Sequence, residues 1–276
     1  MRLSFFSNKG PLIPVVPLTG GIGVSLPFRS AVSATSIESQ LARAFAYRTA
    51  PAVAILINSP GGSAVQSHLI YKRIRALAEE KKKQVIVAVE DVAASGGYMI
   101  ALAGDEIVVD GSSIVGSIGV VFAGFGFQKL IEKLGIERRV HTAGEAKVIL
   151  DPFQPEKEED VARLKSLQRE VHEAFIGLVR SRRPRLADDP EIFTGAFWSG
   201  TRAVALGLAD RVGDLHAVLK EKFGEDVRLK TIAGERGLLR RRLGLARAAR
   251  EPQAAALVEA AIATLEERAL WGRFGL

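Results

Sequence analysis

The sequence predicts an α/β fold in which helices surround a mainly parallel β-sheet. Runs of β-branched residues, such as residues 85–89, alternate with segments of helical apolar spacing over most of the chain. With 276 residues, 47% of them hydrophobic and 25% charged, the chain is long enough to bury a substantial core. We therefore expect one large domain over residues 1–225 and a basic helical extension over residues 226–276.

The first half of the chain contains four strand-like runs and two helical segments. Pro14 and Pro17 cannot donate ladder hydrogen bonds, so the first strand is expected at an edge of the sheet. Ser36 belongs to the residue types that cap helices, and apolar residues follow it at helical spacing. The expected strands are residues 12–18, 52–58, 85–89 and 106–110, and the expected helices are residues 36–46 and 65–80.

The second half begins with small and β-branched residues at 112–121, which suit a strand or loop packed against another backbone. A long helix over 155–183 is predicted because its first turn is acidic and its last turn basic, the order that the helix macrodipole favours. The other expected elements are a helix at 127–134, a strand at 137–141, a capped helix and a short strand within 194–214, and a helix from Leu215.

Composition and spacing exclude several kinds of site. The chain has no cysteine, which rules out disulfides, thiolate metal sites and a cysteine nucleophile. The four histidines do not lie at metal-binding spacings, and the glycine-rich turn at 58–63 lacks the lysine of a phosphate-binding loop. We therefore expect neither a metal nor a cofactor. The histidines are His68, His141, His172 and His216.

Much of the net charge of +7 lies near the C-terminus, where six arginines between Arg236 and Arg250 have no acidic residue among them. Basic and aromatic residues do not interleave, so nucleic acid is not an expected partner. We interpret the arginine-rich segment as a solvated or oligomer-packing appendage, with peripheral membrane contact as the alternative. Neither a membrane-spanning run nor a signal peptide is readable, so the expected location is cytoplasmic, alternatively peripheral at the inner membrane.

Ser95 is the candidate nucleophile. It follows a buried strand and precedes Gly96, where tight backbone geometry opens a short apolar helix. Free amides and the positive end of the helix dipole would stabilise an oxyanion beside its hydroxyl. The alternative is that Ser95 only caps the helix or turns the chain.

The turn at 58–63 and Lys147 are the other candidate parts of the site. In the turn, backbone amides between a strand and a helix can face an anion, which fits an oxyanion hole or simply a tight turn. Lys147 lies among small and apolar residues, and burial there would leave its amine neutral and able to act as a base. The alternatives are a surface lysine, or His141 as the base.

Five sequence blocks follow one another along the chain. They are Asn58-Ser-Pro-Gly-Gly-Ser63, Asp91-Val-Ala-Ala-Ser-Gly-Gly-Tyr98, Gly116-Ser-Ile-Gly-Val120, Gly144-Glu-Ala-Lys147 with Asp151-Pro-Phe153, and Trp198-Ser-Gly-Thr-Arg-Ala-Val-Ala-Leu-Gly-Leu-Ala-Asp210. By these blocks the chain resembles the signal peptide peptidase A family of serine proteases, peptidase family S49, which has the Clp-protease and crotonase type of fold. The resemblance covers about Leu12 to Leu219.

The resemblance implies a serine endopeptidase in which Ser95 is the nucleophile and Lys147 the general base. It further implies that Ser117 orients the lysine and that the amides of Gly62 and Gly96 bind the oxyanion. The expected substrates are short, unfolded, fairly apolar peptides, and the expected assembly is a homo-oligomeric ring or dome. The chain departs from the family in its arginine-rich tail and in lacking the N-terminal membrane anchor of many members.

Two other functions remain open at this point. A crotonase-like acyl-CoA enzyme would use the two oxyanion glycines on a thioester and would need no serine. A catalytically silent scaffold would assemble at membranes through the arginine-rich segment. Covalent labelling by a serine-directed probe distinguishes the peptidase from both.

Overall fold

A mostly parallel β-sheet forms the centre of the computed structural model, which describes residues 10–23, 31–144, 146–233, 265 and 268–276. The strands are β1 (Leu12–Thr19), β2 (Ala52–Ser59), β3 (Gln84–Ala94), β4 (Glu106–Val109), β5 (Ile114–Gly116), β6 (Phe197–Ser199), β7 (Arg211–Val212) and β8 (Arg228–Thr231). Their order is β6-β5-β3-β2-β1-β8, and β4 pairs with β3 and β7. Among the described strands only β6 runs antiparallel, to β5, so the predicted α/β class is confirmed.

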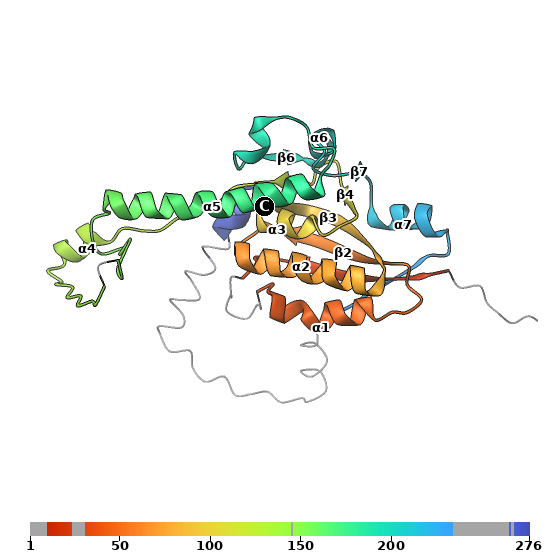
Figure 1. Ribbon diagram of the computed structural model, residues 1–276, viewed down its shortest axis with the longest axis horizontal. Coiled ribbons are helices and arrows are strands. Elements are labelled where there is room, and N and C mark those ends of the chain that lie inside the picture. The colour runs from red at the N-terminus through yellow and green to blue at the C-terminus, as the bar shows by residue number, and fades with distance from the viewer. Residues whose placement is uncertain (1–9, 24–30, 145, 234–264, 266–267) are drawn as a thin grey trace, which may run out of the picture.

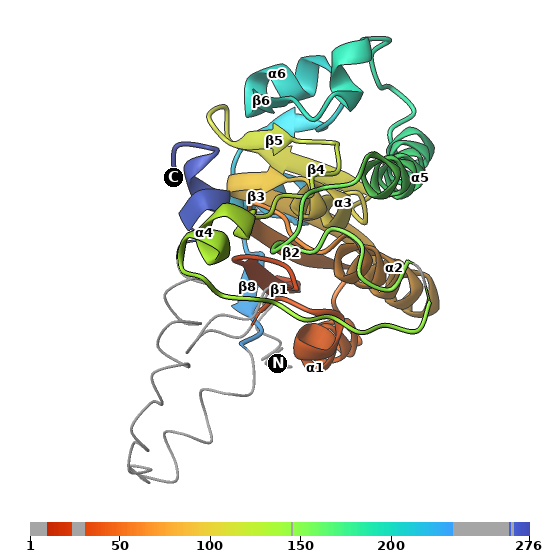
Figure 2. The same cartoon turned by 90° about the vertical axis from the view of Figure 1, so that its left-hand side faces the viewer.

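The helices are α1 (Ala34–Phe45), α2 (Ala64–Lys81), α3 (Gly96–Ala101), α4 (Gln128–Lys133), α5 (Glu158–Arg182), α6 (Gly200–Ala205), α7 (Leu215–Phe223) and the 3-10 helix η1 (Pro190–Phe193). Figure 2 shows α1, α2, α3 and α5 on the same side of the sheet. Val85 of β3 belongs to the core that these helices cover, whereas Ile86 belongs to the core of the other face, with Val218 of α7. Successive side chains of β3 thus pack alternately into the cores on the two faces of the sheet.

Serine side chains start the two helices that flank β2. The Ser33 hydroxyl accepts a hydrogen bond from the amide of Ser36, and the Ser36 hydroxyl accepts one in return from the amide of Ser33. The Ser63 hydroxyl accepts from the amide of Gln66 at the start of α2. These bonds satisfy amides that have no partner within the first turn of a helix.

Three sequence predictions need correction. β1 is an interior strand rather than an edge strand, because β2 lies on one side and β8 on the other. β8 pairs only with Leu12 to Val15, so Pro17 lies beyond its end. Residues 137–141 are not a strand, and the sheet continues to Thr231, past the expected domain boundary at residue 225.

A long excursion, residues 120–157, leaves the body after β5 and returns through α5; we call it the arm. Figure 1 shows it at one end of the molecule, where α4 and the first turns of α5 extend away from the sheet. A small cluster holds it together: the rings of Phe127 and Phe153 lie 5.7 Å apart, and the guanidinium of Arg138 lies 5.0 Å from the Phe153 ring. The arm therefore has contacts of its own, although α4 has no buried residue.

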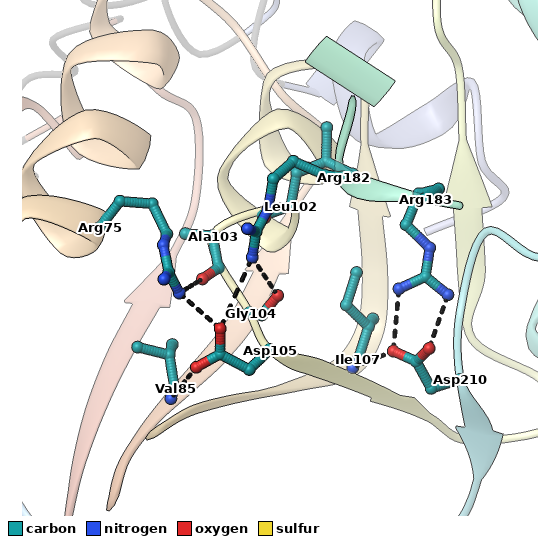
Figure 3. A network of polar contacts seen from close by, with 10 residues as sticks. All are labelled: Arg75, Val85, Leu102, Ala103, Gly104, Asp105, Ile107, Arg182, Arg183 and Asp210. Carbon is teal, nitrogen blue, oxygen red and sulfur yellow. Dashed lines mark hydrogen bonds and ion pairs between the residues drawn. The ribbon is translucent and has the colours of Figure 1, made fainter. Parts of the chain in front are cut away.

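Two arginines fix the other end of α5 to the body (Figure 3). Arg182 donates to the carbonyl oxygens of Leu102 and Gly104, both at 2.9 Å, just beyond the end of α3. Arg183, which is buried, donates two hydrogen bonds of 2.9 and 2.8 Å to the carboxylate of Asp210. Arg182 thus attaches the end of α5 to the segment after α3, and the bidentate pair of Arg183, which specifies geometry as well as affinity, attaches it to the residue before β7.

The C-terminal residues that the structure describes pack against the body. Phe274 is buried with Val92 and Ala94 of β3, and its ring lies 5.0 Å from that of Phe197. The segment Arg236–Arg250 lies outside the described residues. Within the described residues, we find no helix with the length and apolar character needed to span a bilayer.

Candidate active site

Ser95 lies at the junction of β3 and α3 in a backbone conformation that is rare for a residue with a side chain. Its φ is +52° and its ψ is −119°, and such strained positions are concentrated at functional sites. The residue is half-buried, and its side chain makes no capping hydrogen bond to α3. The structure thus does not support the alternative that Ser95 only caps the helix.

Backbone contacts hold Ser95 in this conformation. Its amide donates to the carbonyl of Gly116 at 2.8 Å, and its carbonyl accepts from the amide of Met99 at 2.9 Å. A side chain at Gly97 would place its Cβ 2.7 Å from the carbonyl oxygen of Ser59, which explains the second glycine of the turn. The strain at Ser95 is therefore maintained by neighbours on three elements.

The glycine turn after β2 packs directly on the Ser95 turn. A Cβ at Gly61 would lie 2.8 Å from the Cβ of Ser95, and a Cβ at Gly96 would lie 3.4 Å from the amide nitrogen of Gly62. The amide of Ser63 donates to Ile22, but no hydrogen bond within the described chain is donated by the amides of Gly62 or Gly96. The two amides predicted to bind an oxyanion therefore lie near each other beside Ser95.

Ser117 lies next to this junction. It follows Gly116, is 5% exposed, has a φ of +53°, and donates its amide to Ala196 at 2.7 Å. A Cβ at Gly116 would lie 2.8 Å from the ring of Trp198, so the chain passes closely over that ring. The blocks at 91–98, 116–120 and 198–210 thus meet here.

Tyr98, the last residue of the block at 91–98, has a structural role. Its buried hydroxyl donates to the carbonyl of Leu208 at 2.8 Å, which ties α3 to the chain after α6. Burial raises the pKa of Tyr98, so the phenol stays neutral and keeps its proton for this bond. Tyr98 therefore positions the helix that follows Ser95.

Lys147 lies elsewhere. It is exposed, in a turn of the arm, and no hydrogen bond joins its side chain to Ser95 in the described chain. The predicted burial of Lys147 is wrong for the single chain, because the arm extends away from the body instead of packing on it. The chain alone thus brings together Ser95, Ser117, Gly62 and Gly96, but not the lysine.

Asp151 and Phe153, from the same sequence block as Lys147, stabilise part of the arm. Arg138 donates to the carboxylate of Asp151, which also accepts from the amide of Phe153 at 3.0 Å. These hydrogen bonds hold the pKa of Asp151 below its ordinary value. Asp151 therefore stabilises the arm near Lys147, and its contacts in the described residues indicate no catalytic role.

His172 is a neighbour of the site that the sequence pattern does not single out. Its Nε2 lies 3.0 Å from the carbonyl oxygen of Ile118, so α5 is connected to the segment after β5. A lone histidine within a long helix carries no spacing signal, which is why sequence reasoning misses it. His141 is exposed on the arm, and no cluster of metal-binding side chains occurs within the residues that the structure describes.

Family comparisons match most of the chain. The model of peptidase family S49 matches residues 77–228, and the Clp protease model matches residues 24–112. Together they include the Ser95 junction, the glycine turn and the arm.

Two curated relatives show how the match is distributed. A protein of Brucella abortus named Na⁺/H⁺ antiporter NhaA is 56% identical over 273 residues, which are 96% of this chain but 37% of that protein. The chloroplastic serine protease SPPA of Arabidopsis thaliana is 36% identical over 176 residues, 62% of this chain and 26% of that one. The chain spans about a third of the length of these relatives, and their names describe longer proteins.

A solved structure shares the fold. It is a membrane-bound stomatin-specific protease, 1510-N, in a lysine-to-alanine mutant bound to a substrate peptide. Its TM-score is 0.51 at 16% identity, and the match covers 92% of this chain and 99% of that one. The predicted Clp-protease type of fold is thereby confirmed.

Proposed function

Since this chain belongs to peptidase family S49, we propose that it is a serine endopeptidase that forms an acyl-enzyme on Ser95. The observation that carries the proposal is the left-handed backbone of Ser95 beside the amides of Gly62 and Gly96. A hydroxyl next to two free donors is the arrangement that acyl transfer requires. The fit of both family comparisons to this region supports the same reaction class.

The proposed reaction has two steps. The Ser95 oxygen attacks the scissile carbonyl, its proton passes to the neutral amine of Lys147, and the Gly62 and Gly96 amides donate to the oxyanion. The lysine then returns the proton to the leaving amine, and water releases the acyl group from Ser95 by the same route. In this proposal Ser117 accepts a hydrogen bond from the lysine and orients it.

We further propose that the arm packs against a second copy of the chain and that the catalytic pair is completed in a homo-oligomer. Among the residues that the structure describes, 17 large hydrophobic side chains are exposed and 10 of them lie on the arm; patches of this kind mark protein interfaces. Burial in such an interface would disfavour the charged form of Lys147, as a general base requires. The ten are Val120, Val121, Phe122, Phe125, Phe127, Leu130, Leu134, Ile136, Val140 and Ile149.

The proposed substrates are short, unfolded, fairly apolar peptides bound in extended form. The solved stomatin-specific protease was captured with a substrate peptide, which supports a peptide as the substrate class for this fold. Peripheral membrane contact through Arg236–Arg250 remains a proposal from composition, since that segment is not described.

A fluorophosphonate probe tests the reaction class. Mass spectrometry of the intact protein and of its peptides should find one adduct, on Ser95, that is absent from Ser95→Ala. Lys147→Ala should lower labelling and peptide hydrolysis by about 10³-fold or more, because the proton would have no acceptor. Matched variants Ser112→Ala and Lys133→Ala, in exposed positions of the body and the arm, should behave as wild type.

Two results would replace the proposal. Binding of an acyl-CoA without labelling of Ser95 would favour the crotonase-like reaction, which needs only the Gly62 and Gly96 amides. Binding to anionic vesicles without labelling or hydrolysis would favour the silent scaffold.

A further inference from the structure

A hollow of about 240 Å³ lies between the base of the arm and the side of α5. Four of its five lining residues belong to α5, and the fifth is the first residue of the arm. They are Val120, Lys165, Gln168, Arg169 and His172. The proposed reaction uses none of these side chains.

The hollow is basic, and its positive charge is not neutralised by neighbours. Lys165, Arg169 and His172 are separated by four and three positions, a spacing that places them on one face of a helix. Within the described residues, no carboxylate lies within 4.0 Å of the Lys165 ammonium or the Arg169 guanidinium. Arg182 and Arg183, at the other end of α5, each donate hydrogen bonds to the body. The contrast marks Lys165 and Arg169 as cations available to a ligand.

One short stretch of chain connects the hollow to Ser95. Gly116 accepts the amide of Ser95, Ile118 contacts His172 of α5, and Val120 lines the hollow itself. At about 3.3 Å per extended residue, the four steps along the chain from Gly116 to Val120 span about 13 Å. A peptide acylating Ser95 therefore needs only a few more residues to reach the hollow.

We propose that this hollow is a subsite that binds a carboxylate of the peptide substrate, between the Lys165 ammonium and the Arg169 guanidinium. The inference rests on the proposed peptidase function and adds to it a preference for acidity a few residues from the scissile bond. The carboxylate comes either from a glutamate or aspartate side chain or from the C-terminus of the peptide. Val120 and Gln168 would contact the neighbouring methylene and amide groups.

Binding to the full chain carrying Ser95→Ala tests the subsite without requiring turnover. The probes are labelled apolar octapeptides in which one glutamate is moved along the sequence, each compared with its glutamine counterpart. At the position that reaches the hollow, glutamate should bind about fivefold more tightly than glutamine. Free and amidated C-termini, compared in the same series, distinguish the two sources of the carboxylate.

Substitutions that remove charge test whether Lys165 and Arg169 bind the carboxylate. Adding Lys165→Gln and Arg169→Gln should abolish the glutamate preference while leaving binding of the glutamine peptides unchanged. Lys157→Gln with Arg163→Gln removes two other charges from the same end of α5 and should keep the preference. Equal binding of all peptides, no binding of any, or equal loss in both double variants would overturn the inference.

Two further measurements separate the inference from neighbouring explanations. If Lys165→Gln with Arg169→Gln lowers the oligomer mass in light scattering, these cations contact another copy of the chain and the subsite is wrong. Hydrolysis of the glutamine peptides by the wild-type protein reports on the peptidase proposal alone. A glutamate preference without hydrolysis would therefore leave the subsite standing and reject the reaction.

Discussion

The two halves of the proposed catalytic centre differ in how the chain builds them. The half around Ser95 is made of closely packed turns whose glycines let backbones pass within van der Waals contact, and a single chain brings its residues together. The half that carries Lys147 is an exposed arm with a small cluster of its own and many solvent-exposed apolar residues. Core contacts position the first half, whereas we propose that the second packs on another copy of the chain.

This difference indicates which part of the proposed function would depend on association between copies of the chain. The proposed nucleophile and oxyanion donors would need no partner, since contacts within the chain hold them in place. The proposed base would need one, since Lys147 is exposed in the single chain and burial in an interface would favour its neutral form. The following predictions test the division, from the largest expected effect to the smallest.

Leu130→Asp with Leu134→Asp should break the arm's proposed contact. These side chains are 52% and 62% exposed and one helical turn apart, so the change costs the single chain little but buries two charges in an interface. We expect hydrolysis to fall about 100-fold or more and the light-scattering mass to fall to a smaller species. The melting temperature of the body should stay within a few degrees of wild type.

Val212→Asp is the control, because Val212 is also an exposed apolar residue but lies on β7 in the body. It should keep both mass and activity. If the arm variant keeps full activity and mass, the division between a complete half and a dependent half is wrong.

Gly62→Ala should destabilise the body far more than Gly126→Ala destabilises the arm. A Cβ at Gly62 would lie 2.1 Å from the carbonyl oxygen of Ile22 at a φ of +142°, whereas a Cβ at Gly126 has no neighbour within 4 Å. Urea unfolding should show a loss of about 3 kcal/mol for Gly62→Ala and less than about 0.5 kcal/mol for Gly126→Ala. Similar losses at both positions would contradict the close packing described for the Ser95 half.

Acidification should destabilise the arm but not the body. Arg138 lowers the pKa of Asp151, so the stabilisation of the arm is present above about pH 4 and is lost as the pH falls through the lowered pKa. Partial burial, together with Asp91, raises the pKa of Glu90 in β3, so protonation of Glu90 on acidification does not destabilise the body.

Hydrogen exchange between about pH 5 and pH 3, corrected for the intrinsic rates, measures both effects. Residues 137–153 should lose protection while residues 84–94 keep theirs. Asp151→Asn should show the loosened arm already at pH 7 and no further change on acidification. Arm protection that stays constant in the wild type would show that the Asp151 pair contributes nothing there.

Local signals were sufficient to predict most elements of the body and helix α4 of the arm, but not the exposure of Lys147 on the arm. The β-branched run at 85–89 predicted β3, and the glycines at 61–62 and 96–97 predicted the turns that meet at Ser95, because these patterns reflect local geometry. The apolar neighbours of Lys147 predicted burial, but apolar residues also occur on surfaces that bury only on association. Burial by a partner is therefore indistinguishable from burial by the core in a single sequence.

Non-local pairing accounts for the remaining differences. Pro14 and Pro17 suggested an edge strand, yet β8, more than 200 residues later in sequence, adds to that side of β1. His172 meets Ile118 across 54 positions, a separation that no spacing rule covers. Such contacts depend on which elements become neighbours in the fold, and that is decided by the packing of the whole chain.

Arg182 and Arg183 attach one end of α5 to the body, and the other end of α5 carries the arm, so a tilt of α5 would move the arm. His172 contacts Ile118, and Phe175 and Val179 are buried, so the part of α5 that extends beyond the body runs from Glu158 to about His172. This part is about 21 Å long, so a tilt of about 5° would displace the end that carries the arm by about 2 Å. Substitutions at Arg182 or Arg183 would thus shift Lys147 and alter the proposed catalysis without changing a residue of the proposed site.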